Sequence, residues 1–259
     1  MRKRQGRISV SRFRGDQVKQ KLLGVNYDNV TMAEALDIGS ELLKTAEPDY
    51  VVTPNSEILY QAQTDDVLLC ALNGASLILP DGIGVVKASR ILKSPLKEKV
   101  AGIEFGEAMI EYCAQNGYSV FFLGSKPGIA EAAAARMEEK YPGLRIAGTH
   151  DGYFSDNDEI VSLIKAAEPD MLFVCLGAPK QELWMHEYAA ATGAKLVCGL
   201  GGSLDIFAGV SQRAPDIWIR LGLEWAYRLF KEPWRIKRQK NLPRFLVYVI
   251  KKRILGEYD

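Results

Sequence analysis

The sequence predicts an α/β fold, in which a mainly parallel sheet is flanked by helices, with a basic helical C-terminal appendage. Short apolar runs alternate with longer amphipathic segments along most of the chain, and glycine or proline follows most of the runs. Parallel strands need such crossover helices, so this alternation indicates a Rossmann-like sheet. The appendage is indicated by the charge pattern, because basic residues are concentrated at the two ends.

The first half of the chain supplies strands and helices in alternation. Residues 22–27 form an apolar run typical of a short strand. Thr31 and Glu34 make a capping box, which begins a helix that ends near Thr45. The next elements predicted are a strand at 50–53, a helical stretch at 56–73, a strand at 75–79 and a helix at 84–92.

The second half repeats the alternation after a Lys- and Pro-rich connection at 93–99. The pattern does not change in character before the last strand, so we expect a single α/β domain over residues 22–210. The elements predicted here are helices at 105–116, 127–141, 156–167 and 179–191, and strands at 118–123, 145–149, 171–176 and 195–198.

Charge divides the chain into three parts. The chain has 259 residues and a formal net charge of +1, but a leader at 1–21 has 8 basic residues against 1 acid. The tail at 211–259 has 12 basic residues against 5 acids, and the middle has 13 against 26. Basic ends on an acidic body suggest an anionic surface as partner.

The cysteines and the apolar runs bear on the compartment. Cys70, Cys113, Cys175 and Cys198 are widely spaced and form no C-x-x-C pair, as expected of reduced core thiols in a cytosolic protein. No apolar segment follows the basic N-terminus in the manner of a secretory signal, and no run is long enough to span a membrane. We therefore expect a soluble or peripheral protein.

Asp81 is the strongest candidate for chemistry. It stands in Leu79-Pro80-Asp81-Gly82, directly after the strand at 75–79. Ligands of open α/β sheets bind beyond the carboxyl ends of the strands, so a lone acid there is a candidate general base. Pro-Asp-Gly is also favoured in turns, and a purely structural role is the alternative.

Other strand ends carry polar or glycine-rich loops. Thr53 and Asn55 follow one strand, where they can reach a ligand or cap the next helix. Gly124 opens a loop whose free amides can hold an anion, although its spacing is not that of a P-loop. Gly177 precedes Lys180 and Gln181, whose side chains suit a diphosphate or sugar hydroxyls. The structural alternative is that Lys180 is solvated and Gln181 caps the helix. The glycines of 199–202 permit close backbone approach.

Metal and nucleophile motifs are weak. Asp156-Asn157-Asp158 resembles a D-x-D metal-nucleotide motif, but acids also suit the start of a helix. The two histidines, His150 and His186, lie far apart in the pattern and offer no metal-ligand or catalytic-triad spacing. We therefore predict no metal site.

The tail contains cationic amphipathic segments. Trp218, Leu221, Trp225 and Leu229 fall on one helical face, and a second apolar set follows Pro243 beside basic residues. Such segments are typical of helices that lie in a membrane interface and are attracted to anionic lipid. The alternatives are core packing for the first helix and contact with a second copy for the last, so a homo-oligomer stays open. We predict no nucleic-acid binding, since no recognisable nucleic-acid module accompanies the charge.

Six motifs follow one another along the chain: Thr53-Pro54-Asn55-Ser56-Glu57, Pro80-Asp81-Gly82, Val100-Ala101-Gly102, Gly148-Thr149-His150-Asp151-Gly152-Tyr153-Phe154, Gly177-Ala178-Pro179-Lys180-Gln181-Glu182 and Arg213-Ala214-Pro215. This ordered set resembles the WecG/TagA/CpsF glycosyltransferases over about residues 22–245. Part of the tail, Leu221–Trp225 with Glu232–Arg235, looks like the same family's C-terminal appendage.

The resemblance implies an inverting transferase without a cofactor, acting at the cytoplasmic membrane face. The enzyme would move N-acetylmannosamine or a related sugar from UDP to a lipid-diphosphate-linked GlcNAc, in teichoic acid or other cell-surface polymer assembly. Asp81 would deprotonate the acceptor hydroxyl. Thr53, Asn55 and Gln181 would hold sugar and diphosphate, and helix N-termini with Arg213 would meet the charge on departing UDP, without a metal.

Two other function classes are weighed against this one. A nucleotide-binding oxidoreductase is disfavoured, because no G-x-G-x-x-G fingerprint with a ribose-binding acid is present. A noncatalytic membrane or nucleic-acid adaptor would use the two basic ends and would turn over no sugar nucleotide.

Overall fold

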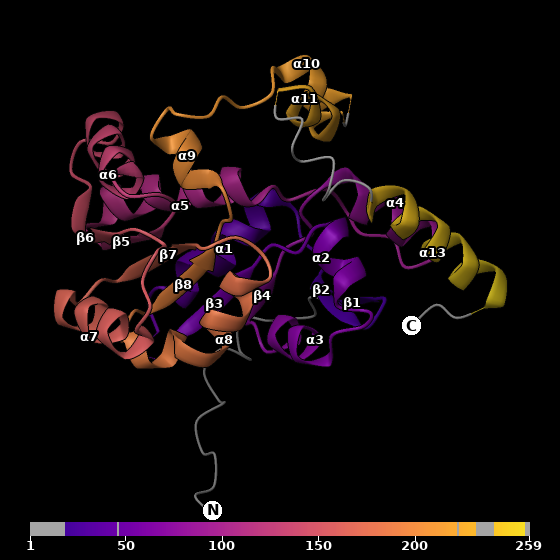
Figure 1. The fold of residues 1–259 in the computed structure, drawn as a ribbon, viewed down its shortest axis with the longest axis horizontal. Helices are drawn as coiled ribbons and strands as arrows, with labels where there is room; N and C mark the ends of the chain where they lie inside the picture. The colour runs from indigo at the N-terminus through magenta and orange to yellow at the C-terminus, as the bar shows by residue number, and fades with distance from the viewer. Residues whose placement is uncertain (1–18, 46, 222, 232–240, 257–259) are drawn as a thin grey trace, which may run out of the picture.

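The computed structural model describes residues 19–45, 47–221, 223–231 and 241–256. Its centre is a six-stranded sheet in the order β4-β3-β8-β7-β5-β6 (Figure 1). Every pairing in this sheet is parallel, so all six carboxyl ends lie at one edge, as the predicted α/β fold requires. The strands are β3 (Asp49–Val52), β4 (Leu77–Ile78), β5 (Ser119–Gly124), β6 (Arg145–His150), β7 (Met171–Cys175) and β8 (Leu196–Gly199).

Helices cover both faces of the sheet (Figure 1). One hydrophobic cluster joins the sheet to α1, α5, α6 and α9, and the other joins it to α2, α3, α4, α7 and α8. The helices are α1 (Met32–Leu42), α2 (Ser56–Gln61), α3 (Asp66–Asn73), α4 (Ile83–Ile91), α5 (Gly102–Asn116), α6 (Ile129–Lys140), α7 (Asn157–Ala167), α8 (Lys180–Thr192) and α9 (Ser203–Phe207).

The strands are apolar because they are buried on both faces. In β5 every residue is buried, and alternate side chains enter different clusters. Phe121 and Leu123 pack on one side, whereas Val120 and Phe122 pack on the other. Successive side chains of a strand point to opposite faces, so a doubly covered strand is apolar throughout.

One predicted strand is a hairpin instead. Residues 22–27 are divided between β1 (Lys19–Leu22) and β2 (Val25–Asp28), which pair antiparallel outside the main sheet. Leu23 and Gly24 turn the chain with φ of 51° and 82°, the positive values that a tight hairpin turn requires. The prediction of a single strand was wrong, because Leu23 is apolar like Leu22 and so the turn at Leu23-Gly24 looks like the interior of a strand. Residues 19–21 of the predicted leader belong to β1, and residues 1–18 lie outside the described part of the chain.

The predicted helix over residues 56–73 is interrupted. α2 ends at Gln61 and α3 begins at Asp66, where the Asp65 carboxylate accepts the Leu68 N–H. The Gln63 amide also donates to the Leu59 carbonyl at the end of α2. Polar side chains thus satisfy backbone groups at the break, which the continuous apolar periodicity conceals.

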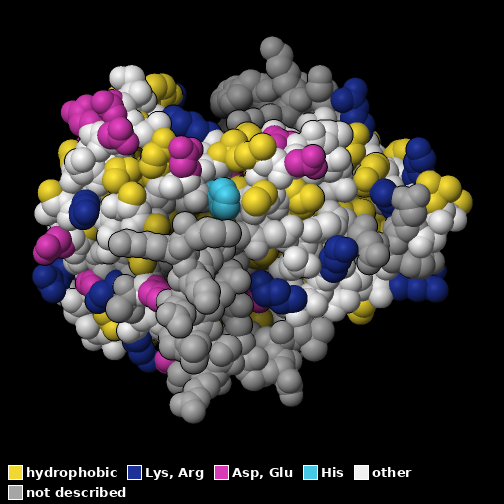
Figure 2. Space-filling model, turned by 90° about the horizontal axis from the view of Figure 1, so that it is seen from below, with side chains coloured by type: hydrophobic (Ala, Val, Ile, Leu, Met, Phe, Trp, Pro, Cys, Tyr) yellow, Lys and Arg dark blue, Asp and Glu magenta, His cyan; other side chains and the backbone are white. Residues whose placement is uncertain are grey.

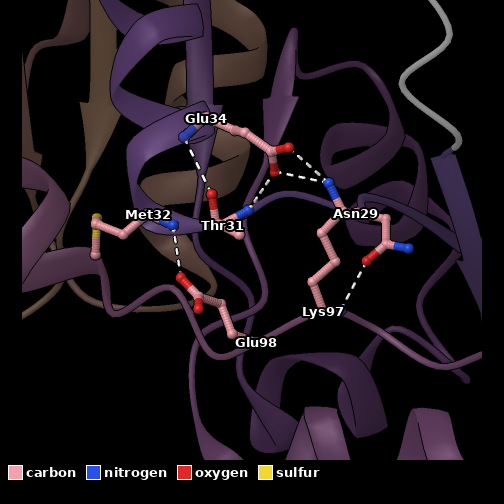
Figure 3. Close-up of polar contacts among 6 residues, drawn as sticks. All are labelled: Asn29, Thr31, Met32, Glu34, Lys97 and Glu98. Atoms are coloured by element: carbon pink, nitrogen blue, oxygen red, sulfur yellow. Dashed lines mark hydrogen bonds and ion pairs between the residues drawn. The ribbon is translucent and has the colours of Figure 1, made fainter.

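The connection between α4 and α5 is fixed to the start of α1 by polar contacts (Figure 3). Lys97 Nζ lies 2.7 and 2.8 Å from the Glu34 carboxylate oxygens, and Glu98 accepts the Met32 N–H. The predicted capping box is present, since Glu34 also accepts the Thr31 N–H. Beyond this anchor, the Val100 N–H donates to the Pro80 carbonyl, next to Asp81. The connection therefore supports the loop that carries Asp81.

The appendage consists of short helices and a longer terminal one. α10 (Asp216–Arg220) and α11 (Glu224–Lys231) are separate, so Trp218 and Trp225 do not share one continuous helix as predicted. α13 (Asn241–Leu255) packs on α2 and α4, and it buries Phe245 and Val249. The part of the predicted appendage at Glu232–Arg235 lies outside the described residues. Within the described part, no helix is both long and apolar enough to span a membrane.

Candidate active site

Asp81 lies at the carboxyl edge of the sheet, in the loop between β4 and α4. Two positions of this loop require glycine, because Gly82 has φ of 93° and Gly84 leaves no room for a Cβ against the Ser56 hydroxyl. The Asp81 residue is partly buried. Glycine is thus required on the C-terminal side of the carboxylate, and the Pro80 carbonyl is held on the other side by Val100.

The buried Tyr27 brings the hairpin to the same place. Its hydroxyl donates to the Pro54 carbonyl at 3.1 Å, in the loop that follows β3. Burial raises the pKa of Tyr27, and the nearby Asp81 carboxylate raises it further. The hydroxyl therefore stays protonated at neutral pH, and Asp81 lies close enough to oppose its ionisation.

Thr53 and Asn55 follow β3, the strand beside β4. Thr53 is buried, and its hydroxyl donates to the Gly199 carbonyl at 3.2 Å. Asn55 Oδ1 accepts the Glu57 and Ile58 N–H groups, so this side chain caps α2. Its Cβ lies 3.8 Å from the position that a Cβ of Gly82 would take. The structure thus brings Asn55 next to the Asp81 loop, with the Asn55 amide nitrogen remaining as a donor.

Gln181 lies in the first turn of α8, and its side chain reaches the loop after β8. Its Oε1 accepts the Gly201 N–H at 2.9 Å, and its Nε2 donates to Glu182 Oε1 at 2.7 Å. Only 3% of Gln181 is exposed. Thr53 and Gln181 therefore hold the loop at 199–202 from opposite sides.

A cavity of about 620 Å³ opens at the ends of β5, β6 and β7. The chain runs from β5 outward to β6 but from β7 back to β8, so the direction of the connections changes between β5 and β7. Ligands of open α/β sheets bind at such a switch point. The lining residues are Ser125, Lys126, Gly152, Tyr153, Phe154, Ser155, Cys175, Leu176, Lys180 and Asp205.

The cavity lining combines cations, hydroxyls and an acid. Lys180 Nζ lies 4.9 Å from the centre of the Phe154 ring and 3.4 Å from the Gly152 carbonyl. The Ser125 hydroxyl donates to Asp205 at 2.9 Å. The Tyr153 ring is 72% exposed. Such a lining can bind a ligand with an aromatic ring, hydroxyls and negative charge.

The two predicted glycines differ in what they do. Gly124 has φ of 132°, and a Cβ there would collide with the Cys175 carbonyl, so glycine is needed for contact between β5 and β7. Gly177 has φ of 77°, but a Cβ there would meet open space. Gly124 thus shapes the edge of the cavity through packing, and Gly177 through backbone conformation.

Arg213 lies away from the cavity lining. Its Nη2 forms an ion pair with Glu104 in the first turn of α5, and its Nε is buried without a partner. The same turn of α5 contacts Thr53, because a Cβ on Gly102 would lie 2.9 Å from the Thr53 hydroxyl. Arg213 is thus near the Thr53 end of the site, paired with a carboxylate of the protein.

The weaker sequence motifs have local partners. Asp156 caps α7, where its carboxylate accepts the Asp158 and Glu159 N–H groups. His150 contacts the Asp151 carbonyl, and His186 contacts the Tyr50 hydroxyl. The described residues contain no group of three or more His, Cys, Asp or Glu arranged to hold a metal ion.

Sequence reasoning assigned no role to three residues of this edge. Glu182 stood inside a motif that was singled out, and Asp205 follows the glycines of 199–202 by three residues, so their position was visible although their contacts were not. Tyr27 gave no local signal, because it reaches the site only through the hairpin. Arg213 lies beside the carboxyl edge. The other predicted site residues lie along it: Asp81, Thr53, Asn55, Gln181, Lys180, Gly124 and Gly177.

Comparison with known proteins identifies the family. A family model described as the glycosyl transferase WecG/TagA/CpsF family matches residues 20–258, which include the α/β domain and the appendage. The chain belongs to this glycosyltransferase family. The resemblance inferred from the motifs is therefore confirmed, and the carboxyl edge is the candidate active site of a glycosyltransferase.

Two relatives of this glycosyltransferase share a name. A protein from Bacillus spizizenii is 38% identical over 202 residues, covering 78% of this chain and 79% of the relative. A protein from Staphylococcus aureus strain MRSA252 is 37% identical over 241 residues, covering 92% and 94%. Each is named N-acetylglucosaminyldiphosphoundecaprenol N-acetyl-beta-D-mannosaminyltransferase.

Proposed function

We propose that this enzyme transfers N-acetylmannosamine from UDP-N-acetylmannosamine to N-acetylglucosaminyl-diphosphoundecaprenol at the inner face of the cell membrane. The product would enter teichoic acid or other cell-surface polymer assembly. The observation that carries the proposal is the similarity to the Staphylococcus aureus transferase along 92% of the chain. The family match over residues 20–258 includes every residue of the candidate site.

The nucleotide end of the donor fits the cavity at the switch point. Lys126 and Lys180 supply positive charge for a diphosphate, and the exposed Tyr153 ring offers a face for a base. Asp205 provides acceptor oxygens for ribose hydroxyls beside its bond to Ser125. Because the N-cap of α6 is Gly128, which offers no side chain to the first turn, amides of that turn are also suited to phosphate oxygens.

The donor then extends along the sheet edge toward Asp81. β7 and β4 are separated by two intervening strands, so their ends lie about 14 Å apart at ordinary strand spacing. The loops between them carry Thr53, Asn55 and the 199–202 segment with Gln181. A sugar nucleotide lying across these loops has its anomeric carbon near Asp81 and its base in the cavity.

Asp81 then acts as the general base of an inverting displacement. The acceptor hydroxyl loses its proton to the Asp81 carboxylate while its oxygen forms a bond to the anomeric carbon. The bond from that carbon to the UDP oxygen breaks, and UDP leaves with the electron pair on the opposite face. Helix amides, Lys180 and Arg213 meet the charge on UDP, provided that Arg213 is released from Glu104.

The appendage is suited to dock on an anionic membrane. Exposed apolar side chains occur on α10, α11 and α13, including Phe230 at 82% and Ile254 at 78%. Lys231, Arg244 and Lys251 are exposed beside them. Figure 2 shows Lys and Arg next to hydrophobic side chains at the end of the molecule that carries α13. Cationic amphipathic helices of this kind bind anionic lipid surfaces, although a second copy of the chain would also cover them.

Membrane docking is tested with a matched pair of variants. Val247 in α13 and Val67 in α3 are 66% and 67% exposed. We expect Val247→Asp to weaken co-sedimentation with anionic vesicles, and Val67→Asp to leave it unchanged. Equal binding by both variants would argue against docking through α13, and a concentration-dependent dimer that Val247→Asp disrupts would assign this face to a second copy.

The transferase activity is tested by UDP release from the purified protein. A panel of UDP-sugars is supplied with and without a lipid-diphosphate GlcNAc acceptor, first in EDTA and then in Mg²⁺. We expect acceptor-dependent release that is fastest with UDP-N-acetylmannosamine and that continues in EDTA. Release only after Mg²⁺ is added would show that a metal takes part, and no turnover of any donor with vesicles present would overturn the proposed function.

A further inference from the structure

Glu182 is a buried acid that the reaction described above does not use. Its side chain follows Gln181 in α8, and 0% of the residue is exposed. Oε1 accepts the bond from Gln181, but Oε2 is buried without a hydrogen-bond partner. None of the ion pairs in the described residues includes Glu182. An unpaired carboxyl oxygen in a protein interior is costly, so stability alone does not account for this side chain.

The hydrogen bonds of Gln181 make its orientation dependent on Glu182. The Gly201 backbone N–H can only donate, so the amide oxygen of Gln181 must face it. The amide nitrogen then faces Glu182, whose Oε1 accepts. A side chain at 182 without an acceptor oxygen would leave the buried amide nitrogen of Gln181 without its acceptor, which would weaken the hold of Gln181 on Gly201.

The loop that receives this bond occupies the middle of the site. β8 lies between β3 and β7, and its exit loop is held by the Thr53 hydroxyl on one side and by Gln181 on the other. Gly201 has φ of 55°, and the Leu200 N–H donates to the Val174 carbonyl at the end of β7. The loop thus separates the Asp81 end of the edge from the cavity.

We propose that Glu182 is a positioning residue: through Gln181 it fixes the loop at 199–202, which aligns the donor between the cavity and Asp81. The role in aligning a donor rests on the proposed function. The chain of hydrogen bonds from Glu182 through Gln181 to Gly201 does not depend on it. Burial raises the pKa of Glu182, which favours a neutral acid that retains Oε1 as an acceptor. A neutral amide at 182 can therefore take its place.

Two substitutions separate the acceptor from the charge. Glu182→Gln keeps an acceptor oxygen and removes the ionisable group, whereas Glu182→Leu removes the acceptor. Hydrogen–deuterium exchange over residues 199–204 is measured without substrate, and kcat and KM are measured for the donor. Glu187→Leu is the control, because it makes the same change at an exposed position of the same helix.

We expect Glu182→Leu to exchange faster over 199–204 and to lose kcat on the order of 10-fold or more, since small misalignments of bound reactants are costly. Glu182→Gln and Glu187→Leu should match the wild type in both measurements. If Glu182→Leu does not fold, Glu182→Asp withdraws the carboxyl group by one methylene and is measured in the same way, with the same expected loss.

The opposite results are equally clear. Wild-type exchange in the folded variant without the acceptor would overturn the hydrogen-bond chain, and faster exchange with unchanged kcat and KM would overturn the positioning role. If the wild type transfers no sugar, the proposed function fails, and with it the positioning of a donor. The exchange measurement then still decides whether Glu182 holds the loop.

Discussion

The two edges of the sheet hold acids in opposite environments, one just before β7 and one soon after it. At the amino edge, the Asp170 carboxylate accepts the Ser119 N–H and lies 2.7 Å from Lys195 Nζ. At the carboxyl edge, the acid is Glu182, which takes part in none of the described ion pairs and leaves one buried oxygen unpartnered. The acid at the amino edge is thus fully paired, as stability requires, whereas the acid at the carboxyl edge, beside the candidate site, is not.

The pKa values of these two acids move in opposite directions. Partial burial acts to raise the pKa of Asp170, but the bonds from Lys195 and Ser119 outweigh it and lower the pKa overall. Burial raises the pKa of Glu182, and the Gln181 bond opposes it without reversing the shift. Groups with raised pKa values in an interior are often found at functional sites, and the location of Glu182 beside the candidate site agrees with that tendency.

Asp81→Asn gives the largest effect expected at the carboxyl edge. Asparagine keeps the size of the side chain but cannot take a proton from the acceptor hydroxyl. General-base catalysis contributes about 100- to 10,000-fold, so we expect kcat to fall by about that factor. UDP binding and Tm should change little. The matched control is Asp37→Asn at an exposed position of α1, and substantial residual turnover by Asp81→Asn would remove Asp81 from the base role.

The sequence predicted the sheet because its strands are buried on both faces. Runs such as Val120–Leu123 are apolar throughout, so their position was plain without knowledge of what covers them. The hairpin and the break at 62–65 were missed because Leu22-Leu23 and the apolar positions of α2 and α3 continue the local pattern. In both places a turn or cap decides the structure, and apolar periodicity does not record it.

The position of the candidate site could be predicted from the sequence, but its contacts could not. Asp81, Thr53 and Gln181 follow separate strands, and parallel pairing places all such ends at one edge. The partner of Gln181 is different, because Gly201 meets it only when β8 inserts between β3 and β7. The sequence of a single segment does not determine the order of the strands, so these contacts could be identified only from the structure.

Asp170→Asn tests the amino edge, with the opposite expectation to that for Asp81. The substitution removes a carboxylate that binds Lys195 and Ser119, and hydrogen bonds to charged groups contribute about 1.5 kcal/mol or more. We expect a Tm lower by about 3–6 °C for a chain of this size. The kcat and KM of the folded enzyme should equal those of the wild type. If Asp170→Asn loses kcat without any loss of Tm, the amino edge would have a functional role, and the contrast between a structural and a functional edge would fail.

The smallest effect expected is the pH dependence of Tm, measured against the wild type for Glu182→Gln and Asp170→Asn. The folded protein holds a proton on Glu182 above the ordinary pKa of 4.5, so this acid lowers stability progressively as pH rises through that range. Glutamine has no such dependence, and the Tm of Glu182→Gln should exceed that of the wild type by a margin that grows from about pH 4.5 toward neutral.

The pKa of Asp170 is lowered from 3.8, so its contribution is present above that pH and is lost on acidification. The deficit of Asp170→Asn should therefore be almost constant from neutral pH down to about pH 4, and it should shrink only as the pH falls below 3.8. An offset of Glu182→Gln that does not vary with pH would mean that folding leaves the pKa of Glu182 unchanged, and the electrostatic contrast between the two edges would then be lost.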